Sequence, residues 1–220
     1  MRSIKISERL KEKWGKAALG CIECQVQVKP SSQELREKLD EIITQLQESL
    51  VIEEIKTQPA IAQTRACCKA LGKDVKRYRN SAEAMYRRVL QGKGIYYINN
   101  IVEVNSLISL TTGYSTGTYD LSQVKGDICW DVAEEGVHYP GIRKAPVNIG
   151  HLPALRDEES FFGNPNSDSE RTCVTEDTHH ILMCIYGFDG AEPLKNILEK
   201  TAEALQKYCK ASDMEISIKD

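Results

Sequence analysis

The chain has 220 residues, of which 41% are hydrophobic and 28% are charged, and its formal net charge is −3 at pH 7. This length and apolar content are enough to bury the core of one domain over residues 1–220. The sequence contains no apolar run of about 18 residues, and its N-terminal stretch MRSIKISERLKEKWGK lacks a signal-peptide core, so we expect a cytoplasmic protein without a membrane partner.

The eight cysteines and four histidines do not form a metal-binding pattern. Cys21 and Cys24 form a C-x-x-C, but they lie in GCIECQVQV, whose alternation is typical of a strand and would point the two thiols to opposite faces. His138 and His151 stand apart from other candidate ligands. We therefore expect neither a metal nor a cofactor.

The first third of the chain predicts a strand followed by helices. Ser31 and Glu34 are spaced as a capping box, and leucine and isoleucine then recur at helical spacing to about Leu50. Pro59 begins a second helical segment, which Gly72 ends. Next, Ser81 is expected to cap a helix that Gly92 ends.

A basic segment spans this last helix. Between Arg65 and Lys93 nine Lys or Arg residues accompany two acids, which gives a local charge of +7 in a chain whose total is −3. Such asymmetry favours contact with phosphate, although a solvated basic surface explains the charge equally well. The residues expected to contact RNA are Lys76, Arg77, Arg79, Arg87, Arg88 and Lys93.

The next helix is apolar around most of its circumference, with Asn100 and Glu103 as its expected capping pair. Asn105 and Ser109 lie one turn apart within it. Because an unpaired buried amide costs about 1–3 kcal/mol, Asn105 must have partners, either neighbouring backbone or a ligand. Gly113 is expected to end this helix.

The remainder of the chain combines glycine-rich turns with strands. Gly117 is expected in a turn where backbone can approach a ligand closely, and ICWDVA reads as a strand. Residues 136–153 read as loop-rich, and 157–171 read as a functional or flexible loop. The apolar run ILMCIYGF indicates a central strand, and a helix from Pro193 and a final strand complete the chain.

Residues 98–128, INNIVEVNSLISLTTGYSTGTYDLSQVKGDI, closely resemble the central motif of the tRNA-binding and editing domain of the phenylalanyl-tRNA synthetase beta chain. A second block, SERTCVTEDTHHILMCI, is similar to the stretch that leads into a buried strand of the same domain. The resemblance spans about residues 78–185, with 1–77 and 186–220 as additions. It is strongest to freestanding relatives of this domain.

The resemblance implies an α+β, three-layer fold with a mixed β-sheet and flanking helices. In the synthetase the domain hydrolyses tRNA mischarged with tyrosine. Gly117 stands at the position of a family histidine and Cys184 at that of a glutamate that reads the tyrosine hydroxyl, so tyrosine specificity is not implied. The expected substrate pocket comprises Asn99, Asn105, Ser106, Ser109, Gly117, Thr118, Tyr119, Gly163, Asn164 and Cys184.

Three hypotheses for the function follow. The chain could hydrolyse a misacylated tRNA in trans, bind tRNA without chemistry, or hold an amino acid or related metabolite in a pocket. The expected partners are the aminoacylated 3′ end of tRNA and an amino-acid moiety, not DNA, and the oligomeric state stays open. The chain is too short to contain a class II synthetase core beside this domain, and we identify no catalytic triad.

Overall fold

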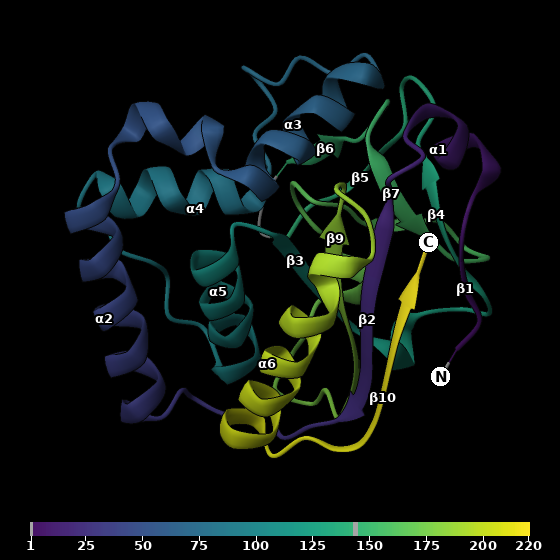
Figure 1. Ribbon diagram of the computed structural model, residues 1–220. Coiled ribbons are helices and arrows are strands. Elements are labelled where there is room, and N and C mark those ends of the chain that lie inside the picture. Colours follow the sequence, from purple (N-terminus) through teal and green to yellow (C-terminus); the bar gives the residue numbers. More distant parts are fainter. Residues whose placement is uncertain (1, 143–144) are drawn as a thin grey trace.

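The computed structural model describes residues 2–142 and 145–220, and it has three layers (Figure 1). Helices form the first layer, a four-stranded sheet of order β10-β2-β9-β3 forms the second, and a four-stranded sheet of order β1-β4-β7-β8 forms the third. The α+β fold with a mixed sheet and flanking helices is therefore confirmed.

The elements follow one another along the chain with short connections. The α-helices are α1 (Glu8–Lys13), α2 (Gln33–Ser49), α3 (Pro59–Ala70), α4 (Ser81–Leu90), α5 (Asn100–Thr112) and α6 (Glu192–Cys209). The strands are β1 (Ile4–Ile6), β2 (Ala18–Gln25), β3 (Ser115–Asp120), β4 (Ile128–Val132), β5 (His138–Pro140), β6 (Pro146–Asn148), β7 (Pro153–Arg156), β8 (Phe161–Gly163), β9 (His180–Gly187) and β10 (Ser212–Lys219). Short 3-10 helices span Ile52–Thr57, Leu121–Gln123 and Glu170–Thr172.

The central sheet is antiparallel throughout and separates two cores. Its strands alternate, so Cys24 packs toward the helices whereas Cys21 packs toward the second sheet, and the expected opposite orientation of the two thiols is confirmed. The same alternation divides β9, where Met183 faces the helices and Cys184 faces the second sheet. Which face a residue of this sheet occupies therefore decides which core it can reach.

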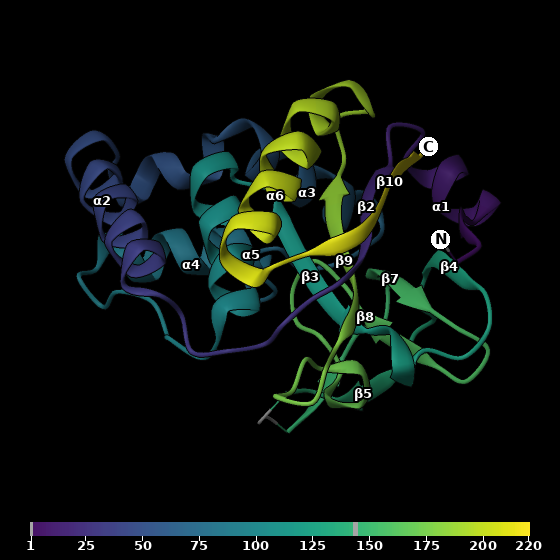
Figure 2. The ribbon, with the colours of Figure 1, turned by 90° about the horizontal axis from the view of Figure 1, so that it is seen from below.

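The helix layer is built around α5, which is buried on most sides as its apolar sequence predicts. It packs against α2, α4 and α6 as well as against β3, and the view from below shows α5 enclosed between the other helices and the sheet (Figure 2). Gly113 ends the helix with a φ of 76°, a left-handed conformation that glycine adopts without strain. No helix in the described ranges is long and apolar enough to cross a membrane.

The second sheet is mixed, because β1 runs parallel to β4 while β4, β7 and β8 pair in antiparallel fashion. Trp130 of β4 fills the space between the sheets and lies 5.6 Å from the ring centre of Tyr186. The prediction of a loop-rich stretch after residue 136 was partly wrong, since β5, β6 and β7 lie there. These strands have three or four residues, too few for the alternation of a strand to be visible in the sequence.

Two predicted helix caps were wrong by one residue. Ser32, not Ser31, accepts a hydrogen bond from the backbone N–H of Leu35 and caps α2. Asn80, not Ser81, caps α4. In each pair both residue types are good caps, so the sequence alone does not choose between neighbours.

Candidate functional site

A cavity of about 720 Å³ lies between the first part of α5 and the loop that precedes β9. Its walls come from residues 28–30, from the stretch around Ile98 and Asn105, and from the loop at 168–176, together with Thr118 of β3. A volume of this order accommodates a small molecule or the end of a nucleic acid. The cavity lies on the helix side of the central sheet, because Thr118 points toward α5.

Glu103 holds two walls of this cavity together. This buried carboxylate accepts hydrogen bonds from the Ser31 hydroxyl and from the backbone N–H of Ile98, so it joins the segment after β2 to the segment before α5. Burial raises the pKa of Glu103, and the backbone hydrogen bond from Ile98 opposes that shift. Glu103 is therefore a positioning residue for the cavity mouth.

Asn99, rather than Asn100, caps α5: its side chain accepts a hydrogen bond from the backbone N–H of Val102 at 3.0 Å. The prediction of Asn100 as the cap was wrong. Asn100 instead accepts from the Lys29 N–H and donates to the carbonyl oxygens of Gln27 and Tyr208, which ties the start of α5 to β2 and α6. Of the two asparagines, Asn99 lines the cavity.

The polar residues of α5 divide into two groups. Asn105 is half-buried, lines the cavity and accepts a hydrogen bond at Oδ1 from the Thr118 hydroxyl at 2.9 Å. Ser106 is buried and donates to the carbonyl oxygen of Val102, and Ser109 shares a hydrogen bond with Thr116. Asn105 and Thr118 therefore line the cavity, while Ser106 and Ser109 are bonded within the fold.

Asp168 connects the cavity to the interior of the protein. It lines the cavity, and its Oδ1 atom accepts a hydrogen bond from the buried Tyr119 hydroxyl at 2.8 Å. The loop that carries it is fixed by Asp157, whose two carboxylate oxygens each accept from Arg171 at 3.0 Å. Burial raises the pKa of Asp157, but the hydrogen bonds from Arg171 and from backbone amides outweigh it and leave the pKa lowered.

The charged residues among the described lining are mostly acidic. Asp168, Glu170 and Glu176 contribute carboxylates, and Lys29 contributes one ammonium group. A cavity with this balance favours a ligand group that carries positive charge. The site thus suits a cationic group better than a phosphate.

Gly117, Gly163 and Cys184 do come together in the structure, but away from this cavity. Gly117 lies in β3 rather than in a turn, and it pairs with Cys184 on the face of the sheet opposite Asn105. The Tyr119 hydroxyl fills the space beside them, since a Cβ atom at Gly117 or at Gly163 would overlap it. A single pocket bounded by Asn105, Gly117 and Cys184 is therefore not present.

A network of buried tyrosines occupies this second region. The hydroxyls of Tyr119 and Tyr186 are hydrogen-bonded to each other, and burial, reinforced by the charge of Asp168, raises the pKa of both well above the ordinary value. Asn164 donates to the hydroxyl of Tyr139 and orders the loop before Asp168. On the side that faces the protein interior, Asp168 thus accepts a hydrogen bond from a neutral tyrosine hydroxyl.

We expect Gly163→Ala to destabilise the protein by about 2–3 kcal/mol, because the added methyl group overlaps the Tyr119 hydroxyl and ring in a packed core. Urea denaturation followed by circular dichroism measures the change. Gly15→Ala is the matched control, since its nearest contact would be an ordinary 3.7 Å from the carbonyl oxygen of Lys11. Equal midpoints for the two variants would contradict the close packing around Gly163.

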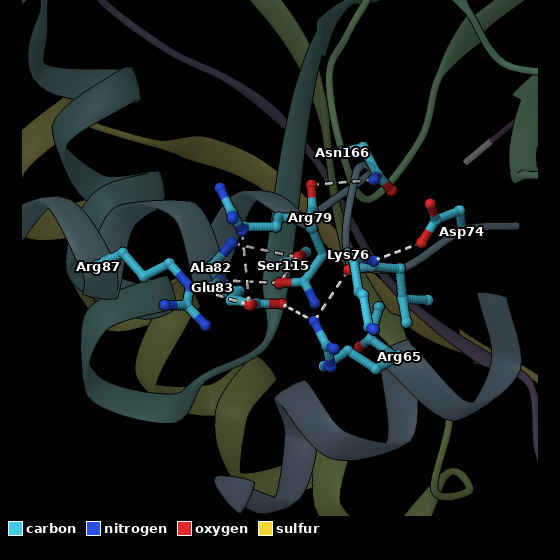
Figure 3. A network of polar contacts seen from close by, with 12 residues as sticks. Arg65, Asp74, Lys76, Arg79, Ala82, Glu83, Arg87, Ser115 and Asn166 are labelled. Carbon is cyan, nitrogen blue, oxygen red and sulfur yellow. Dashed lines mark hydrogen bonds and ion pairs between the residues drawn. The ribbon is translucent and has the colours of Figure 1, made fainter. Parts of the chain in front are cut away.

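The basic segment contains a cluster around one buried carboxylate. Figure 3 shows Arg65, Arg79 and Arg87 pointing toward Glu83, at N···O distances of 2.7, 4.0 and 3.1 Å. Glu83 is fully buried, whereas the three arginines are partly exposed. The arginine cluster therefore fixes α4 against α3 and leaves a surplus of positive charge at the surface.

The other expected RNA contacts differ in their surroundings. Lys76, Arg77 and Lys93 are exposed, although Lys93 lies within hydrogen-bond distance of Gln91. Arg88 is half-buried and stacks over the ring of Tyr96. The loop at residues 164–168 contacts this surface through a hydrogen bond from Asn166 to the Arg79 carbonyl oxygen (Figure 3), so the basic surface and the cavity wall are adjacent.

Metal ligands and reactive thiols are the other candidates to consider in residues 2–142 and 145–220. No group of three His, Cys, Asp or Glu side chains in these ranges is arranged to hold a metal ion. Cys184 is fully buried, which raises its pKa and disfavours a reactive thiolate. His138 is exposed and lies beside the Gly136 carbonyl oxygen.

The sequence did not single out Lys29, Asp168, Glu170 or Glu176 as lining residues. Asp168 and Glu170 lie in the stretch 157–171 that was expected to be a functional or flexible loop, so the composition of the loop was a usable signal. Lys29 and Glu176 had none, since single charged residues between elements are normally solvated.

The chain forms an α+β domain with a cavity beside a buried helix. Residues 63–216 match the B3/4 domain, and the chain belongs to the B3/4 domain family. The resemblance to the domain of the phenylalanyl-tRNA synthetase beta chain is thereby confirmed, and in that chain the B3/4 domain is associated with tRNA binding and editing.

The chain was also compared with solved structures and with curated protein sequences. Among solved structures, the chain is similar to an N-terminal fragment of the phenylalanyl-tRNA synthetase beta-subunit from Pyrococcus horikoshii, with 14% identity and a TM-score of 0.46. The alignment covers 99% of this chain and 50% of that fragment, so the chain spans about half its length. No curated protein sequence matches the chain.

Proposed function

We propose that the chain binds the aminoacylated 3′ end of tRNA and hydrolyses the ester of a misacylated tRNA in trans. The observation that carries the proposal is the acid-rich cavity in a B3/4 domain. An aminoacyl ester keeps a free α-ammonium group, and carboxylates such as Asp168 and Glu170 are suited to bind it. In this proposal the aminoacyl group binds in the cavity and the body of the tRNA binds to the surface beside it.

The reaction requires a positioned water molecule rather than a protein nucleophile. The water oxygen attacks the ester carbonyl carbon, the bond from that carbon to the ribose oxygen breaks, and the proton passes to that oxygen, which yields free amino acid and tRNA. Asp168 would hold the ammonium group, and the hydroxyl of Thr118 and the amide of Asn105 would orient the ester. Catalysis would come from positioning.

The interstrand region at Gly117 and Gly163 does not support oxyanion binding in this mechanism, because Tyr119 fills it. The polar groups of the cavity itself would therefore stabilise the reaction.

The exposed cations beside the cavity support the tRNA part of the proposal. Lys76, Arg77 and Lys93 are exposed residues of the basic segment that contains the arginine cluster, where they can contact phosphates of the acceptor stem. Their contribution should weaken steeply with salt concentration, as phosphate contacts do.

The test is deacylation of a panel of tRNAs, each charged with a non-cognate amino acid carrying a radioactive label. We expect release of free amino acid from at least one member at a rate proportional to protein concentration. A heat-inactivated sample is the control. Release at the control rate from every member, with tRNA binding retained, would leave a non-catalytic tRNA-binding module; such a module is the second candidate because no histidine lies among the described lining residues.

A further inference from the structure

An exposed aromatic platform lies at the mouth of the cavity. Tyr96, Tyr97 and Ile98 follow one another in the connection between α4 and α5, and they are 67%, 41% and 55% exposed. Large apolar side chains exposed in sequence are unusual outside binding surfaces. Ile98 itself lines the cavity, so the platform continues directly into the proposed site.

Both rings of the platform are fixed in place. The Arg88 guanidinium lies 4.0 Å from the ring centre of Tyr96, and that of Arg36 lies 5.1 Å from the ring centre of Tyr97. The Tyr97 hydroxyl also donates to Asp40 at 2.9 Å. Guanidinium groups stacked on aromatic rings order them at little cost and leave the other ring surface available.

The charges around the platform select a nucleic acid over an apolar partner. Arg36 and Arg88 lie over the two rings, with Asp40 as the acid bonded to Tyr97, and Lys29 lies in the cavity wall with Ile98. The Nε atom of Arg88 is buried without a hydrogen-bond partner, so the cation behind Tyr96 is not neutralised through that atom. Aromatic rings interleaved with cations are the usual surface for unpaired bases and their phosphates.

We propose that Tyr96 and Tyr97 stack the unpaired nucleotides at the 3′ end of an RNA and direct the group attached at that end into the cavity. The inference rests on the proposed function and extends it by naming the residues that hold the unpaired 3′ end. The chain thus reads a single-stranded end rather than a duplex at this surface. Ile98 then lies between the stacked bases and the cavity.

The experiment measures fluorescence anisotropy of two labelled RNA hairpins, one with an unpaired 3′ extension of four nucleotides and one with a blunt end. For the double variant Tyr96→Ala, Tyr97→Ala we expect affinity for the extended hairpin to fall about 10-fold to 100-fold, as loss of base stacking predicts. Binding of the blunt hairpin should not change. The variants Tyr96→Phe and Tyr97→Phe keep the rings and should bind like the wild type.

Tyr208→Ala is the matched control, because Tyr208 also has a cation over its ring but belongs to α6 rather than to the connection between α4 and α5. Thermal unfolding checks that each variant is folded. Unchanged binding of the extended hairpin by the double alanine variant, or an equal loss for both hairpins, would overturn the stacking role.

The outcomes distinguish failure of the stacking role from failure of the proposed function. If the double variant binds both hairpins normally and the wild type deacylates tRNA, the platform is refuted and the proposed function stands. If the wild type binds neither hairpin, tRNA binding itself fails, and the inference fails with it. A platform that joins two copies of the chain would show as a change in sedimentation without a change in RNA affinity, which also overturns the inference.

Discussion

Replacing Glu83 with glutamine should lower the free energy of unfolding by about 3 kcal/mol. The carboxylate is fully buried and is the shared partner of Arg65, Arg79 and Arg87, so its neutralisation leaves neighbouring guanidinium groups to repel one another. Glutamine keeps the shape of the side chain but offers an amide whose N–H groups oppose arginine donors. Chemical denaturation measures the loss.

The matched control is Glu192→Gln, which removes an exposed carboxylate that pairs with Lys195 within one helix. Exposed pairs of this kind contribute little, so its unfolding midpoint should equal that of the wild type. A Glu83→Gln variant as stable as this control would show that solvent already screens the arginine cluster.

For Asp168→Asn, we expect kcat/KM of deacylation to fall about 10-fold to 100-fold, as loss of a charge-assisted hydrogen bond of about 1.5–3 kcal/mol predicts. The fold should persist, because the Oδ1 atom of asparagine can still accept from the Tyr119 hydroxyl. The cavity would lose the charge that binds the α-ammonium group. Initial rates on the best substrate of the panel, with thermal unfolding alongside, measure both effects.

Asp177→Asn is the control for this prediction, since Asp177 is an exposed acid of the same loop region that does not line the cavity. The prediction fails if Asp168→Asn retains the wild-type rate while folded. It also fails if Asp177→Asn loses as much activity, because a general effect of loop charge would then explain both.

Much of the fold was predictable because long elements carry clear periodicity. The helix at Gln33–Ser49 has the helical repeat that the sequence displays, the strand His180–Gly187 has the continuous apolar run of a central strand, and Gly113 ends α5 as expected. The strands after residue 136 were missed because three or four residues do not establish a period. Caps shifted by one residue where two capping residue types are adjacent.

The site was less predictable, because strand register decides which residues face the cavity. Gly117 and Asn105 are close in sequence, but Gly117 lies in a strand whose alternation points it away from α5. The sequence predicted Gly117 in a turn, where successive residues need not point to opposite faces, so its orientation away from α5 was not foreseen. Asn99, Asn105 and Thr118 do line the cavity, whereas Asp168 comes from a loop whose position only tertiary contacts fix.

The hydrogen bonds of Glu103 bear on how substrate preference could diverge among relatives of this chain. One carboxylate joins Ser31, the backbone before α5 and the helix itself, so a change on that wall disturbs the start of the central helix. The opposite wall includes residues 173–176, which are at least partly exposed and lie outside any helix or strand, so substitution there disturbs less of the fold. If the cavity binds the aminoacyl group, new amino-acid preferences should therefore accumulate in residues 173–176 while the Glu103 wall stays constant.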